Sequence, residues 1–215
     1  MSNHAPGGTI VESQIRSQKT IWSLPMTTPP PDEAPSAVLR AEHRVIVRVL
    51  DVLRHLVARS ERSESFEIDS LKRCVTFFRL FADACHHAKE EDLLFPVLEE
   101  RGIPRDGGPI GVMLHEHAVA RQLTRQMAEA LAAFDRGDVE AERTFCGTAR
   151  EYIALLTDHI QKEDHCLFAM GDQAMTEDDQ ASLCKKFCDV GCRAFEGRRR
   201  EELEHIADEL EAQYG

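Results

Sequence analysis

The chain has 215 residues, with 38 acidic against 26 basic side chains and a formal net charge of −12. This charge argues against nucleic acids and anionic membranes as partners, because both are themselves negatively charged. We find no signal-peptide pattern at the start and no apolar run near the roughly 20 residues that span a bilayer. The seven cysteines follow no secreted-scaffold spacing. We therefore expect a cytoplasmic protein with mostly reduced thiols.

The first part of the chain differs from the rest. Residues 1–35 contain Gly7-Gly8 and a run of three prolines and have no apolar period, which predicts a flexible N-terminal arm. From Ser36 the apolar spacing becomes helical. Glycine, proline and polar breaks divide the remainder of the chain into four long amphipathic segments and a final helical region. Helices are expected at about 36–60, 67–100, 110–135, 139–170 and 177–213, the last interrupted at Gly191 and Gly197.

This order of elements predicts the fold class. Alternating apolar runs typical of strands are absent. Four long helices with short connections favour an all-α, up-down-up-down four-helix bundle, followed by a C-terminal helical extension. We expect the bundle over 36–172 and the cysteine-containing extension over 173–215.

The ten histidines carry most of the functional information. His43, His117 and His159 lie on the apolar stripes of their helices, whereas His55 and His115 lie off them. Glu163, one turn after His159, also faces inward in this pattern. A buried carboxylate needs a cation or a proton. Inward histidines on several helices, with glutamates one turn later, therefore indicate a metal site more than a structural core.

The second helix contains the ambiguous stretch "CHHAKEEDLLFP" (85–96). Either His86 with Glu90 or His87 with Glu91 could face inward, because residues four apart share a helix face. The fourth helix has the similar stretch "DHIQKEDHCLF", and identical spacing is kept only when His86 and Glu90 match His159 and Glu163. We therefore favour His86 and Glu90, with His87 and Glu91 as supporting or surface residues. Helical phase alone leaves the alternative open.

The number and type of donors predict the metal. Four imidazoles and two carboxylates are too many for one tetrahedral zinc ion. They fit two ions, each with two imidazoles, and with both glutamates bridging. Iron is the first choice, ahead of manganese or zinc. Four further acids could accept the outer imidazole protons, although each is more often a solvated helix charge. These acids are Glu42, Glu91, Glu116 and Asp164.

Four stretches together resemble the hemerythrin-like, or HHE cation-binding, family. They are "LRAEHRVI" (39–46), "HHAKEEDLLFPVLEE" (86–100), "PIGVMLHEHAVAR" (109–121) and "DHIQKEDHCLFAM" (158–170). The resemblance implies a four-helix bundle around an oxo- or hydroxo-bridged di-iron centre. It also implies O₂, nitric oxide, peroxide or redox sensing, or iron handling. The family pattern implies metal ligands at His43, at a His-x-x-x-Glu in the second helix, at His117, and at His159 with Glu163. For the second helix we take His86 and Glu90, the pair favoured by the match with the fourth helix.

One departure from the family bears on function. Oxygen-carrying hemerythrins have a second inward histidine one turn from the third-helix ligand and an aspartate as the last carboxylate. Here Met113 and Arg121 flank His117 at that spacing, and the last carboxylate is Glu163. The resemblance is therefore to the H-HxxxE-H-HxxxE group, and it argues against a dedicated oxygen carrier.

Three functions are compatible with the sequence. The first is a di-iron protein that binds or reduces a small oxidant in sensing or stress response, with a diatomic molecule or peroxide as its ligand. The second is iron storage, delivery or repair of iron–sulfur centres, with a protein redox or iron-transfer partner. The third is a redox-controlled interaction module that uses Cys184, Cys188 and Cys192, which recur at helical spacing. No nucleophile triad or phosphate loop is present, so any catalysis would belong to the metals.

Overall fold

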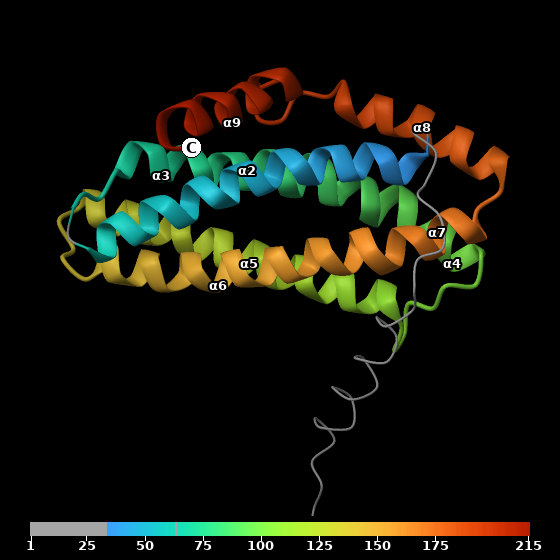
Figure 1. The fold of residues 1–215 in the computed structure, drawn as a ribbon, viewed down its shortest axis with the longest axis horizontal. Coiled ribbons are helices and arrows are strands. Elements are labelled where there is room, and N and C mark those ends of the chain that lie inside the picture. Colours follow the sequence, from blue (N-terminus) through green and yellow to red (C-terminus); the bar gives the residue numbers. More distant parts are fainter. Residues whose placement is uncertain (1–33, 63) are drawn as a thin grey trace, which may run out of the picture.

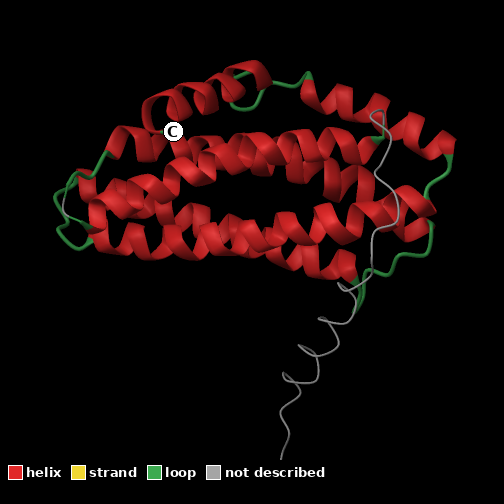
Figure 2. Cartoon of the chain, in the orientation of Figure 1, coloured by secondary structure: helices red, strands yellow, loops and turns green. Residues whose placement is uncertain are grey.

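The computed structural model describes residues 34–62 and 64–215. The expected N-terminal arm, apart from its last two residues, therefore lies outside the described residues. The described residues form helices and loops without a strand, which confirms the all-α bundle (Figures 1 and 2). No helix among them is long and apolar enough to cross a membrane.

The four bundle helices closely follow the expected boundaries. α2 and α5 each have proline in the first turn, where the missing backbone donor costs nothing. Gly137, with φ +88°, makes the tight turn between the third and fourth bundle helices. The helical segments are α2 (Pro35–Glu61), α3 (Ile68–Phe77), α4 (Phe95–Glu100), α5 (Pro109–Asp135), α6 (Ala141–Lys162) and α7 (Phe168–Ala174).

Within residues 34–62 and 64–215, three π-helical segments interrupt the regular α-helical geometry. They are η1 (Phe78–His87), η2 (Glu90–Leu94) and η3 (Glu163–Leu167). Segments η1 and η2 join α3 to α4 in one continuous helix, and η3 joins α6 to α7. A π-helix bonds each N–H five residues back and so has more residues per turn than an α-helix. Neighbouring residues can therefore share one buried face, as His86 and His87 do.

The C-terminal helices α8 (Glu177–Gly191) and α9 (Arg200–Tyr214) pack on the bundle. A capping box between Thr176 and Asp179 starts α8. α9 lies along α2 and α3 (Figure 1) and places Leu203 and Leu210 in the apolar core. The expected helical extension is therefore present. Its status as a separate domain stays a prediction.

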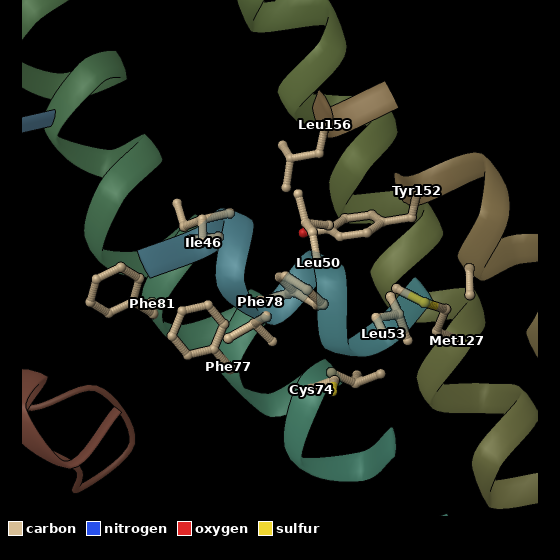
Figure 3. Packing of buried hydrophobic residues seen from close by; sticks show 14 of the residues in the cluster. Ile46, Leu50, Leu53, Cys74, Phe77, Phe78, Phe81, Met127, Tyr152 and Leu156 are labelled. Atoms are coloured by element: carbon tan, nitrogen blue, oxygen red, sulfur yellow. The ribbon is translucent and has the colours of Figure 1, made fainter. Parts of the chain in front are cut away.

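A polar layer separates two apolar clusters inside the bundle. The larger cluster includes Phe77, Phe81 and Tyr152 (Figure 3). The smaller cluster lies toward α4 and α7 and includes Leu39 and Met113. Along each bundle helix, the buried histidines and glutamates fall in sequence between residues of these two clusters, except that Ile160 of the larger cluster follows His159. Close packing on both sides fixes the height of the polar layer in the bundle.

Candidate metal centre

Seven histidine and glutamate side chains form the polar layer, and none is more than 2 % exposed. Their donor atoms fall into two groups, each with all its atoms within 4.8 Å of one another. The first group is His43, His86, Glu90 and Glu163, and the second is His87, Glu90, His117 and His159. The structure thus brings together all six residues that were predicted as metal ligands. It places His87 in the second group as well.

The two glutamates lie between the groups. Glu90 Oε1 is 3.5 Å from His86 Nε2, and its Oε2 is 3.5 Å from His117 Nε2. Glu163 Oε2 is 3.2 Å from His43 Nε2 and 3.3 Å from His159 Nε2. Each carboxylate therefore faces imidazoles of both groups. This is the arrangement that two bridging carboxylates require.

The chemistry of these donors fits metal ions. All four carboxylate oxygens of Glu90 and Glu163 are buried without a hydrogen-bond partner. Burying an unpaired carboxylate costs several kcal/mol, roughly, unless a cation or a proton compensates. Burial and the neighbouring Glu163 charge raise the pKa of Glu90 well above its usual value. Burial would also raise the pKa of Glu163, but the His159 and His43 imidazoles lower it. Without metal, the electrostatically unfavourable carboxylate is therefore that of Glu90.

His87 occupies a different position from the one expected. Its ring is 2 % exposed and stacks on His117, with ring centroids 3.8 Å apart and planes at 14°. The expectation of a surface residue is wrong, because η1 turns both adjacent histidines inward. The supporting role, the other part of the expectation, stays a prediction. Ile160 holds the equivalent place in the fourth helix, so His87 has no counterpart in the other half. The bundle offers five imidazoles rather than four.

The family assignment rests on a direct match. Residues 34–171 match the model of the Hemerythrin HHE cation binding domain. The chain belongs to this family. Uncharacterized proteins of Mycobacterium bovis and of two Mycobacterium tuberculosis strains are each 28 % identical over 174 residues, which is 80 % of this chain and 67 % of theirs. No solved structure matches the chain.

In this hemerythrin-like centre, the Nδ1 atom of each imidazole contacts a carboxylate outside the two donor groups. A carboxylate that accepts the Nδ1 proton fixes the tautomer and directs the Nε2 lone pair inward. Glu42, Glu91, Glu116 and Asp164 therefore take the supporting role, and the expectation of solvated helix charges is wrong for them. Asp83 was not among the expected acids. The Nδ1 contacts are His43 to Asp164 at 2.8 Å, His86 to Glu42 at 3.0 Å, His87 to Asp83 at 3.4 Å, His117 to Glu91 at 2.7 Å and His159 to Glu116 at 3.0 Å.

Each of these carboxylates also forms an ion pair with a lysine or an arginine. Burial alone would raise the pKa of Glu42, but the His86 hydrogen bond and the Lys89 charge outweigh it and lower the pKa to about 2. The carboxylate therefore stays ionised. The ion pairs are Glu42 with Lys89 and Arg200, Asp164 with Arg40, Asp83 and Glu91 with Arg121, and Glu116 with Lys162.

The hemerythrin-like centre should release protons when it takes up metal. Burial would lower the pKa of His159, but the Glu163 and Glu116 carboxylates raise it to about 9. The metal-free protein therefore holds a proton on His159 at pH 7. The raised pKa of Glu90 shifts this carboxyl in the same direction, toward its protonated form. His86 is already neutral, since burial lowers its pKa to about 3.

We therefore expect apparent affinity for Zn²⁺ to rise as pH increases toward 9, by roughly tenfold per pH unit for each proton displaced. Titration calorimetry of metal-free protein in buffers of different ionisation enthalpy measures this release. A heat of binding that is the same in every buffer would contradict the prediction.

Proposed function

We propose that the chain is a non-haem di-iron protein that binds or reduces a small oxidant, such as O₂, nitric oxide or peroxide, in sensing or in the response to oxidative stress. The observation that carries this proposal is the pair of buried donor groups sharing Glu90. Imidazoles and carboxylates without thiolate suit iron. Iron would supply electron transfer and coordination positions that the protein donors leave open.

The surroundings of the centre favour a small ligand. Phe95 stacks on His117 with ring centroids 5.9 Å apart, and Phe168 stacks on His43 at 5.5 Å. These rings exclude bulk water from the imidazoles on the α4 and α7 side. A pocket of about 230 Å³ between η1 and α5 reaches His87, with Arg121 in its wall. A molecule of a few atoms fits this environment, whereas a large organic substrate does not.

The two donor groups are unequal, and the inequality bears on where a ligand binds. The group of His43 and His86 has two imidazoles, and the group of His87, His117 and His159 has three. With both glutamates bridging, the first group would have four donors and the second five, so the first would leave more positions open to an external molecule. His87, which comes from the second helix, also places an imidazole beside His117. The third helix itself has no second inward histidine. The number of imidazoles consequently no longer argues against oxygen binding.

The test is iron loading followed by exposure to oxidant. We expect roughly two irons per chain and a change in the optical spectrum on adding nitric oxide, O₂ or peroxide to the reduced protein. His43→Ala should lose part of the iron and the response. His115→Ala, which alters an exposed histidine of α5, should behave as the unmodified protein.

Two outcomes would redirect the proposal. Iron that binds at full stoichiometry but never responds to an oxidant would exclude oxidant binding and leave storage or delivery. Protein that retains no iron after loading under anaerobic conditions would contradict the di-iron assignment itself.

A further inference from the structure

Arg200 brings a positive charge from the C-terminal extension to the metal centre. Its Nη1 lies 3.0 Å from Glu42 Oε1, and Glu42 is completely buried. The other oxygen of this carboxylate accepts the Nδ1 proton of His86 at 3.0 Å. One carboxylate and one imidazole thus separate the guanidinium of α9 from the first donor group.

In the part of the chain that the structure describes, His159, the counterpart of His86 in the other half, has no equivalent of this contact, although an arginine does pair with the carboxylates that hold His117 and His87. Glu42 and Glu116 play the same part in the two halves, each supporting an imidazole and each paired with a lysine. Of these two carboxylates, however, only Glu42 also pairs with an arginine among the described residues. Lys162, which pairs with Glu116, is in turn shared with Asp158. The two halves therefore differ in the charge behind their supporting carboxylates.

Helix α9 is also held by contacts that do not involve Arg200. Leu203 and Leu210 of this helix are fully buried in the core. Arg48 of α2 forms ion pairs of 2.6 Å with both Asp208 and Glu211. These contacts hold α9 against α2 at a distance from Glu42. A substitution at Arg200 should consequently leave the helix in place.

We propose that Arg200 is a positioning residue that makes the His43 and His86 side of the centre easier to reduce. A cation on Glu42 makes this carboxylate a weaker acceptor of the Nδ1 proton, so His86 donates less electron density to a metal. The positive charge also acts directly through the low-dielectric interior. Both effects favour the lower oxidation state. The inference rests on the metal centre but not on the identity of the oxidant.

The test is the reduction potential of iron-loaded Arg200→Gln. We expect both ions to be retained and the potential to fall by an amount equal to about a tenfold change in the oxidised-to-reduced ratio, which is 59 mV for one electron. Arg200→Lys keeps the charge and should recover most of the shift. Arg48→Gln, which breaks another ion pair between α9 and α2, should leave the potential unchanged.

A second measurement separates this role from a structural one. Removing the Arg200 charge leaves Glu42 more negative, so Co²⁺ should leave the Arg200→Gln protein for a chelator more slowly. A purely structural role predicts faster release, which is the opposite sign. An unchanged potential in Arg200→Gln, or an equal shift in Arg48→Gln, would overturn the inference. These readouts need no oxidant, so they remain informative if the proposed function fails.

Discussion

Replacing Glu90 with glutamine should remove both metal ions and at the same time stabilise the metal-free protein. Among the described residues, Glu90 is the one that both donor groups contain. Glu163 belongs to the group of His43 and His86, although its carboxylate also faces His159. Loss of the Glu90 charge therefore affects both ions. Glutamine keeps the shape of the side chain and removes a buried carboxylate whose oxygens have no hydrogen-bond partner. We expect the metal-free form to gain roughly 1–3 kcal/mol in free energy of unfolding.

The gain should depend on pH in a defined direction. The pKa of Glu90 is raised in the folded protein from 4.5, so the folded state keeps a proton that the unfolded chain loses. Stability from this group is fully present below 4.5 and is lost as pH rises through the folded pKa. The glutamine of Glu90→Gln does not ionise, so the variant does not lose stability in this way. The difference between variant and unmodified protein should therefore widen as pH increases.

Chemical denaturation in the presence of a chelator, from acidic to neutral pH, measures this difference, and elemental analysis measures the metal. Glu91→Gln is the matched control. Its carboxylate holds His117 Nδ1 but belongs to neither donor group, so both ions should remain, with affinity reduced about 10–100-fold. Retention of both ions by Glu90→Gln, or a less stable metal-free form, would refute the assignment of Glu90 as a shared ligand.

Helical periodicity predicted most of the site but not the phase of the second helix. His43, His117 and His159 lie on regular α-helices, where a period of 3.6 residues locates the buried face. The pattern around His86 and His87 fitted two phases equally well. The π-helical segments η1 and η2 explain this, because their extra residues turn both histidines inward. A sequence that fits two helical phases can thus indicate a π-helix.

The supporting acids are harder to recognise for a different reason. Glu42 and Glu116 lie beside the apolar stripe, and their partners are on other helices, so one helix alone cannot show that they are buried. Asp83 precedes His87 by one turn, and the spacing that pairs His86 with Glu90 could also have identified it. In the extension, the sequence directed attention to the cysteines, whereas the contact with the centre is made by Arg200.

The second large effect that we expect is on metal binding, from a substitution at His87. His87→Ile should leave the protein folded but remove one of the two metal ions. Isoleucine occupies the equivalent place in the fourth helix at Ile160, which is buried, so the side chain is compatible with this layer of the bundle. The second donor group would keep His117 and His159 but lose its third imidazole. The group of His43 and His86 would remain complete.

The expected result is a fall from two bound ions to one after dialysis, with affinity for the second ion reduced more than about 100-fold, beyond the effect of losing a supporting residue. Elemental analysis and Co²⁺ absorption spectra measure both quantities. His86→Ile should remove the other ion and so leave a different Co²⁺ spectrum. His115→Ile, at an exposed position, should retain both ions. If His87→Ile also retains both, His87 only packs against His117, and the centre has the four imidazoles that the sequence predicted.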